Sequence, residues 1–260
     1  MRIGEHLYLV GSEQFGLSHP LDSNCYLIDG GSALALVDTG VGMGVDDILA
    51  NIAADGFDPK RLTHILITHS HYGHWGGAEK IQQRTGAKVG CPALGADAMR
   101  DTRNEPGIQF NIKFKRYPEG FEPRPCPPDF TYGDGDTVKI GDIDLKMIVV
   151  QGHTKDSTCF LFEDSGKRGL ITGDVVFYGG KLGLLNLEGF SMDDYRRDIH
   201  KLADLNIDML LPGHGVFILR RGQSHIKRAV HKLGDFVMPE TFFETNEFVW
   251  ERDYLKVMTE

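Results

Sequence analysis

Three histidines lie close together in the stretch THSHYGHWGG, at positions His69, His71 and His74. They follow the apolar run RLTHILIT, which is typical of a buried strand. Alternate side chains of an extended chain share a face, so we expect His69 and His71 to point at one ion, while the turn that follows gives His74 a different direction. Imidazoles gathered at the mouth of a buried strand are costly to leave unpaired, and a divalent metal relieves that cost. The stretch therefore predicts a metal site.

Four more polar residues follow apolar runs in the same way. His153 ends the run VVQGH, His214 ends LLPGH, Asp174 ends GLITGD and Asp38 ends ALVD. Loops at the ends of strands in a rigid sheet are where α/β proteins assemble their sites. We therefore expect these side chains to meet the clustered histidines.

The segments that must position these residues alternate between strands and helices, which predicts an α/β fold. Asp29, Gly30 and Gly31 form a turn signal between two of the strands, Gly86 marks a helix end, and Ser191 with Asp194 resembles a capping box. Strands are expected at 6–11, 24–31, 32–40, 61–68, 87–92, 136–140, 143–152, 157–164, 168–174 and 207–215, and helices at 46–54, 76–86, 191–206 and 223–235.

Three stretches lack such periodicity. Residues 13–23 are expected to form a loop over the site. Residues 97–130 are rich in proline, charge and aromatic side chains, and are interpreted as an irregular insertion that acts as a lid and lines part of the pocket. The aromatic tail at 236–260 is interpreted as packing or a dimer contact, with a substrate pocket as the alternative. We expect residues 1–260 to form one domain with these additions.

Composition limits the kinds of partner. The formal net charge is −9 and the positive residues are scattered, whereas nucleic-acid binding needs a continuous basic surface. No stretch approaches the length of a membrane span. We therefore expect a small-molecule substrate, no nucleic acid and no membrane contact, with a homodimer left open.

Cysteine usage and the N-terminus indicate a compartment. The 4 cysteines form no CxxC pair, and two of them lie in apolar runs, so they are expected to be buried and reduced. The start MRIGEHLYLVG lacks the pattern of a secretory signal. These features predict a cytoplasmic protein.

The polar residues also occur in a familiar order. The chain resembles the metallo-β-lactamase superfamily, whose motif order is Asp, HxHxDH, His, Asp, His, and the match runs from about residue 5 to residue 220. The resemblance implies a four-layer αββα sandwich with metals at one edge. The positions that match are Asp38, His69, His71, His74, His153, Asp174 and His214.

The resemblance also implies a role for each matching residue. His69, His71 and His153 would hold the first metal, and Asp174 would bridge to a second and take part in catalysis. His74 and His214 would serve the second metal. Asp38 would orient a histidine ligand from outside, with a turn cap as the alternative.

One position departs from the family pattern, because Gly73 stands where the motif has Asp. Loss of this carboxylate should leave one ion firmly bound and a second weakly bound or absent. Zinc fits a set of imidazoles and a carboxylate without thiolate, and iron or manganese fits it too. Without the usual Asp to deliver a proton, substrates with good leaving groups are favoured.

These inferences predict a metal-dependent hydrolase of a small ester, lactone or thioester, acting through metal-bound hydroxide. Tyr72 and Tyr178 are candidate catalytic residues. Trp75, Phe177 and Lys181 are candidate pocket residues, although packing or solvation is an alternative for each. Two other functions stay open: a mononuclear iron dioxygenase acting on persulfides, and a family member without catalysis that binds a ligand.

Overall fold

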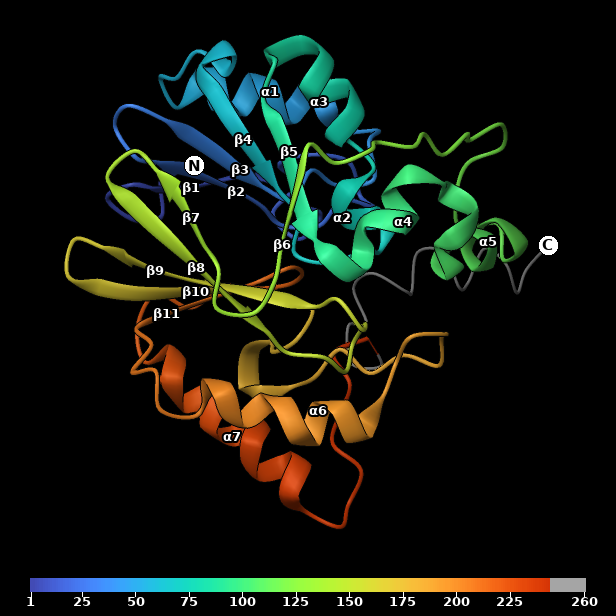
Figure 1. The fold of residues 1–260 in the computed structure, drawn as a ribbon, viewed down its shortest axis with the longest axis vertical. Helices are drawn as coiled ribbons and strands as arrows, with labels where there is room; N and C mark the ends of the chain where they lie inside the picture. Colours follow the sequence, from blue (N-terminus) through green and yellow to red (C-terminus); the bar gives the residue numbers. More distant parts are fainter. Residues whose placement is uncertain (244–260) are drawn as a thin grey trace.

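The computed structural model describes residues 1–243 and shows four layers. Two sheets lie face to face, and helices cover the outer face of each (Figure 1). α1 (Val45–Ala54) and α3 (Ala78–Thr85) cover the first sheet, and α6 (Met192–Asp198) and α7 (Gly222–Gly234) cover the second. The predicted αββα sandwich is therefore confirmed.

The first sheet has six strands in the order β1-β2-β3-β4-β5-β6. Its first three strands are antiparallel, and the predicted hairpin pairs Asp29 with Leu34. From β3 onward the strands run parallel, so their carboxyl ends share one edge. The bounds are Leu7–Gly11, Cys25–Asp29, Leu34–Val37, Leu62–Leu66, Lys88–Pro92 and Phe130–Tyr132 for β1 to β6.

The second sheet has five strands in the order β11-β10-β9-β8-β7. β7 to β10 form an antiparallel meander, and β11 joins β10 in parallel. β8 and β10 consequently end at the same edge as β11. The bounds are Thr137–Ile140, Ile143–Val149, Thr158–Asp164, Lys167–Gly173 and Met209–Pro212 for β7 to β11.

Alternate residues of each strand enter different layers of the core. Leu7 and Leu9 of β1 face the second sheet, whereas Tyr8 and Val10 face the helix layer of the first. This period of two follows from the pleat, and burial on both faces explains the nearly continuous apolar runs in the sequence. The two sheets are held together by packed side chains such as Phe160.

Short helices and 3-10 turns lie in the connections between the strands. α2 (Tyr72–Trp75) follows the first histidines, and α3 ends at Gly86, whose φ of 78° gives the left-handed cap expected from the sequence. Ser191 accepts a hydrogen bond from the Asp194 backbone N–H at 3.1 Å, as the capping pattern predicted. The short 3-10 turns are Pro59–Arg61, Ala93–Gly95, Thr102–Asn104, Tyr178–Gly180 and Ile199–Leu202.

The insertion at 97–130 is more regular than expected. It contains most of α4 (Ala96–Arg100) and all of α5 (Pro106–Lys113). Proline fits the first turn of a helix, and the Glu105 side chain caps α5 by accepting a hydrogen bond from the Ile108 backbone N–H. The stretch is therefore not irregular throughout, because Pro106 occupies the first turn of a helix.

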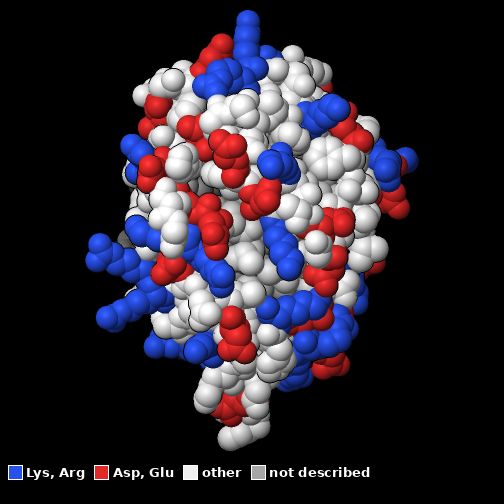
Figure 2. All heavy atoms as spheres, turned by 60° about the vertical axis from the view of Figure 1, so that its left-hand side comes forward, with Lys and Arg blue, Asp and Glu red and all other residues white. Residues whose placement is uncertain are grey.

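Other features of the chain agree with simple expectations. All 4 cysteines are buried as free thiols. Over residues 1–243, no helix is both long and apolar enough to cross a membrane. Positive and negative side chains are interspersed over the face shown in Figure 2. Among the ion pairs, Arg168 and Glu163 lie 3.4 Å apart.

Candidate metal centre

The clustered histidines lie where β4 gives way to α2. β4 ends at Leu66, and the chain continues through Thr68 to His69 and His71 before α2 begins at Tyr72. His69 is buried, as is His74 one turn later within α2. The change from extended chain to helix gives His74 a new direction, as the spacing predicted.

The other polar residues reach the same edge from both sheets. Asp38 follows β3 in the first sheet, whereas His153 follows β8, Asp174 follows β10 and His214 follows β11 in the second. Parallel strands deliver their carboxyl ends to one side, so residues far apart in sequence meet there. The structure thus brings together all six residues proposed as ligands.

Asp174 lies at the centre of this cluster. Its Oδ2 atom is 3.4 Å from His153 Nε2, 3.5 Å from His74 Nε2, 3.7 Å from His214 Nε2 and 4.0 Å from His69 Nε2. His71 approaches from the other side, with Nδ1 2.9 Å from His153 Nε2. We call His69, His71 and His153 the first set, and His74, Asp174 and His214 the second set.

The donor atoms are arranged to take up a cation. The ligand atoms of His69, His71 and His153 lie within 4.8 Å of one another, as do those of His69, His74 and Asp174. Within the described part of the chain, the buried atoms His69 Nε2, His74 Nε2 and Asp174 Oδ1 have no hydrogen-bond partner. Buried polar atoms normally have one, and a divalent ion would supply it to all three. The residues present therefore fit a metal.

The first set is oriented by neutral groups. His153 Nδ1 donates to the Gly183 carbonyl at 2.7 Å, which leaves the lone pair of Nε2 directed at the cluster. The Thr68 hydroxyl donates its proton to Asp38 at 2.8 Å. The Thr68 Oγ1 atom is therefore free to accept a hydrogen bond from His69 Nδ1 at 3.0 Å. Both imidazoles are thereby held in the tautomer that binds a metal through Nε2.

The second set is oriented by carboxylates. Asp38 Oδ2 is 2.8 Å from His74 Nδ1, and Asp38 Oδ1 also accepts from the Thr68 backbone N–H at 2.9 Å. Glu13 Oε1 lies 3.1 Å from His214 Nδ1. Asp38 therefore takes the orienting position expected from the sequence, and Glu13 does the same for a second histidine.

The two sets differ in their pKa values. Burial, followed by neighbouring imidazoles, lowers the pKa of His69 and of His71 well below its ordinary value. Burial also acts to lower the pKa of His74, but Asp174 and Asp38 outweigh it and raise that pKa to about 10. In His214, Asp174 and Glu13 likewise outweigh burial and raise the pKa. In the second set, neighbouring carboxylates thus outweigh burial, which is the opposite of the balance at His69 and His71.

Glu13 was not singled out by sequence reasoning. It lies in the loop at 13–23 that was expected over the site, and it contacts a histidine 201 positions away in the chain. A single charged residue in a loop carries no signal of such a partner. Thr68 and Gly183 were missed for the same reason, since their contacts depend on the fold.

Tyr72 and Trp75 lie in the core and not at the cluster. The Tyr72 hydroxyl accepts from the Arg124 backbone N–H at 2.9 Å, and its ring packs edge-on against Trp75 at 4.7 Å. The Trp75 indole N–H donates to the Ser70 carbonyl at 2.8 Å, and the side chain is fully buried. Their expected roles in catalysis and in the pocket are corrected to packing, because α2 turns both rings toward the helix layer.

Three further candidates lie near η4 (Tyr178–Gly180). Phe177 is fully buried, so it cannot line an open pocket. Tyr178 is 56% exposed and packs on His225 of α7 at 5.1 Å, and its catalytic role stays a prediction. The Lys181 backbone carbonyl accepts from the Phe177 N–H at 2.9 Å in the same turn.

The beginning of the aromatic tail lies against the cluster. The Phe243 ring is stacked toward His153 at 6.2 Å, and Phe242 toward His214 at 6.5 Å. This placement favours the substrate-pocket interpretation for these two residues. Phe248, Trp250 and Tyr254, which also belong to the tail, lie outside the described residues.

Gly73 has open space where a side chain would begin. A Cβ atom built at this position would meet only the Leu21 carbonyl oxygen, 4.0 Å away. The departure from the family motif therefore reflects a missing side chain and not a crowded backbone.

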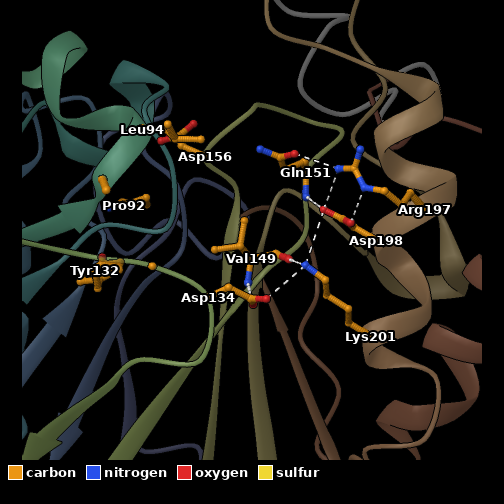
Figure 3. A pocket seen from close by; sticks show the side chains of 12 residues that line it. Pro92, Leu94, Tyr132, Asp134, Val149, Gln151, Asp156, Arg197, Asp198 and Lys201 are labelled. Atoms are coloured by element: carbon orange, nitrogen blue, oxygen red, sulfur yellow. Dashed lines mark hydrogen bonds and ion pairs between the residues drawn. The ribbon is translucent and has the colours of Figure 1, made fainter.

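A separate cavity has a volume of about 380 Å³. Figure 3 shows that its lining cations face carboxylates: Lys201 reaches Asp134 at 3.4 Å, and Arg197 binds Asp198 at 2.8 Å. Its lining includes Asp156, which accepts a hydrogen bond from Ser70 at 3.0 Å, but none of the clustered histidines. Both apolar and charged side chains line this cavity, and its cations are paired with carboxylates.

Relatives of this chain include proteins named as thioesterases and hydrolases. It is 24% identical over 197 residues to an atrochrysone carboxyl ACP thioesterase of Aspergillus fumigatus, covering 75% of this chain and 51% of the relative. It is 25% identical to the acyl-coenzyme A thioesterase MBLAC2 of Bos taurus, covering 83% and 84%. A hydroxyacylglutathione hydrolase of Methylococcus capsulatus is 30% identical, covering 71% and 58%. The chain thus spans about half the length of the fungal and Methylococcus relatives.

Solved structures share the fold. The native FEZ-1 metallo-beta-lactamase from Legionella gormanii superposes with a TM-score of 0.69 at 22% identity, covering 90% of this chain and 93% of that one. A metallo-beta-lactamase from Cronobacter sakazakii gives a TM-score of 0.70 at 20% identity, covering 90% and 92%. The family model described as the Metallo-beta-lactamase superfamily matches residues 19–214, which include every proposed ligand. The chain therefore belongs to the metallo-beta-lactamase superfamily.

Proposed function

We propose that this protein is a metal-dependent hydrolase that cleaves thioesters of small molecules. The observation that carries the proposal is the convergence of four imidazoles on Asp174 Oδ2, with Nε2 distances from 3.4 to 4.0 Å. Buried donor atoms without partners surround that oxygen. A protein core does not need four imidazoles around one buried carboxylate for its packing, so this cluster indicates a functional site.

The ligands favour zinc, because they are imidazoles and a carboxylate without thiolate. The first set would hold one ion, and the second set would hold another more weakly, since Gly73 contributes no carboxylate. A bound divalent ion supplies an electrophile for the substrate carbonyl and lowers the pKa of a coordinated water to about 7.

The chain itself provides orientation. Asp38 fixes His74, Gly183 fixes His153, and Glu13 fixes His214, each through Nδ1. These bonds keep every Nε2 atom directed at the same point and so limit the reorganisation needed during reaction.

Leaving-group chemistry supports thioesters over amides. At position 73 this chain has no side chain that could deliver a proton to the leaving group. A thiol has a pKa of about 8.5, so its sulfur can depart as the anion while the C–O bond forms and the C–S bond breaks. The products are a carboxylic acid and a thiol, and the water proton ends on solvent or on the thiolate. The thioesterase and hydroxyacylglutathione hydrolase names of the relatives support the same class.

The proposal is tested by thiol release from a panel of substrates. Zinc-loaded protein is incubated with acyl-CoA thioesters, S-lactoylglutathione and the matching oxygen esters, and free thiol or acid is measured. We expect thioester cleavage that is lost with a chelator and in His71→Ala. His231→Ala is the matched control, because His231 is an exposed histidine of α7.

Two outcomes would contradict the proposal. One is zinc-replete protein that cleaves none of the thioesters. The other is protein that retains iron on purification and consumes oxygen with a persulfide while hydrolysing no thioester, which would support the dioxygenase alternative.

A further inference from the structure

We propose that Phe242 and Phe243 form the wall that receives the acyl chain, so that the enzyme selects thioesters with apolar acyl groups. The inference rests on the proposed function and adds the substrate class. It concerns residues 240–243, which we call the aromatic strap.

The aromatic strap is fixed to the loop that follows η4. Leu182 N–H donates to the Glu240 carbonyl at 3.2 Å, and Phe242 N–H donates to the Leu182 carbonyl at 2.8 Å. The Thr241 hydroxyl donates to the Leu184 carbonyl at 3.0 Å. These bonds pair the strap with residues 182–184 like a short parallel bridge.

The same loop orients a metal ligand. Gly183 lies between the residues that hold the strap, and its carbonyl accepts from His153 Nδ1 at 2.7 Å. A side chain at this position is excluded, since a Cβ would lie 2.1 Å from the Asp174 carbonyl oxygen. One side of the loop thus fixes the imidazole and the other fixes the strap, so the strap has a defined position relative to the cluster.

Both rings border the imidazoles. Phe243 is stacked toward His153 at 6.2 Å with an interplanar angle of 27°, and it meets His214 edge-on at 6.2 Å. Phe242 is stacked on buried Phe177 at 4.2 Å, which supports it from below. Both rings remain partly exposed. They therefore present apolar surface beside the donor atoms of the first and second sets.

This position suits the carbon chain of the acyl group. The carbonyl carbon must reach the cluster to react, and Phe243 borders that cluster at His153 and His214, so the strap is within reach of the atoms bonded to that carbon. The cavity around Arg197 and Lys201 has none of the clustered histidines in its lining, and an alkyl chain there would also have to desolvate the ion pairs of Arg197 and Lys201 (Figure 3). The aromatic strap offers apolar contact without that opposition, and each buried methylene should improve binding about fourfold.

The test compares chain-length preference in variants of the strap. For zinc-loaded wild type and Phe243→Ala, kcat/KM is measured on acetyl-, butyryl- and octanoyl-CoA. We expect the wild-type ratio of octanoyl to acetyl to exceed about tenfold, and Phe243→Ala to reduce that ratio by about tenfold, mainly through KM. Phe243→Leu should keep most of the preference, because leucine restores an apolar contact.

The matched control is Phe236→Ala, which removes a phenylalanine that is 98% exposed. It should leave both the ratio and the rates at wild-type values. Zinc content and circular dichroism confirm that each variant is folded. As a second measurement, product inhibition by octanoate should weaken in Phe243→Ala, while inhibition by acetate changes little.

Each outcome bears on one proposal or on both. An unchanged octanoyl-to-acetyl ratio in Phe243→Ala, with octanoate inhibition also unchanged, would overturn the inference and leave the thioesterase proposal standing. Wild-type protein that prefers acetyl-CoA would do the same. Wild type that cleaves no thioester would overturn both.

Discussion

The two halves of the metal centre use opposite means to orient their histidines. In the first set, His69 and His153 bond neutral groups, the Thr68 hydroxyl and the Gly183 carbonyl. In the second set, His74 and His214 bond carboxylates. Burial dominates in the first set and lowers the histidine pKa values, whereas carboxylates dominate in the second and raise them.

The carboxylates beside His74 and His214 supply negative charge near the position where Gly73 lacks a side chain. Negative charge still reaches the second set, but Asp38 and Glu13 deliver it to Nδ1 atoms and not to the ion itself. An ion entering the second set must displace protons that the pKa of about 10 at His74 favours at neutral pH. In the first set the histidine pKa values are lowered, so protons do not compete with an ion in this way. The two sets should therefore differ in metal affinity.

The largest effect is expected from removing one ligand of each set. His71→Ala should lose the tightly held ion, and thioester hydrolysis should fall by more than about a hundredfold. His214→Ala should keep one ion through dialysis and lose less activity. Metal counting by mass spectrometry, together with thiol release, measures both. Loss of the retained ion in His214→Ala but not in His71→Ala would reverse the proposed order of affinity.

A carboxylate restored at position 73 should make the two sets more alike. Gly73→Asp places a ligand in space where a Cβ meets only Leu21 at 4.0 Å, so folding should be preserved. We expect affinity for the second equivalent of metal to rise by more than about tenfold, measured by competition with a chelating dye. Gly73→Asn is the control of equal size without charge and should give a smaller gain. An unchanged second equivalent in Gly73→Asp would refute this account of the second set.

Glu13 should affect the second set alone. Glu13→Gln keeps a hydrogen-bond acceptor for His214 but removes the charge, and groups that orient a metal ligand typically affect affinity by about 10- to 100-fold. We expect about a tenfold weaker second equivalent with an unchanged first, measured by the same competition. Glu119→Gln, at an exposed position, is the control. Equal weakening of both equivalents would show that Glu13 acts through general stability.

The fold and the ligands could be predicted because both depend on local pattern. Each ligand follows an apolar run, and the carboxyl ends of such strands meet at one edge whatever the details of packing. Asp38, His153 and Asp174 were found in this way. The αββα layers followed from the same runs together with the resemblance to the family.

The features that could not be predicted depend on the direction in which a side chain points or on contacts between residues far apart in the chain. Tyr72 and Trp75 flank the ligands in sequence, but a single helical turn directs their rings into the core. Phe177 is enclosed for a similar reason, beneath Phe242. Glu13 meets His214 only because the folded loop crosses the edge of the sheets. No periodicity marks such contacts.

The smallest effect on metal binding by the two sets is expected from a change at Glu105, which lies near α2, the helix that follows His71 and contains His74. Glu105 is buried close to the Tyr72 backbone of α2, and its carboxylate accepts a hydrogen bond from the Ile108 backbone N–H. Burial raises the pKa of the Glu105 carboxyl from its ordinary 4.5 to about 7, because it outweighs the hydrogen bonding from the backbone, which lowers that pKa. The folded state therefore holds the proton more tightly, and the Glu105 contribution to stability falls as pH rises from 4.5 to 7.

Glu105→Gln should remove that fall, because the amide accepts the same bonds without a charge. Relative to wild type, we expect the variant to gain up to about 3 kcal/mol in free energy of unfolding between pH 5 and pH 8. Denaturant titrations of both proteins at each pH measure the difference, with Glu122→Gln as an exposed control. Metal affinity of both sets should stay unchanged, since neither set contacts the carboxyl through a ligand atom. A variant that loses stability at pH 8 would show that the ionised carboxylate supports α2 and that the junction between the sets depends on charge.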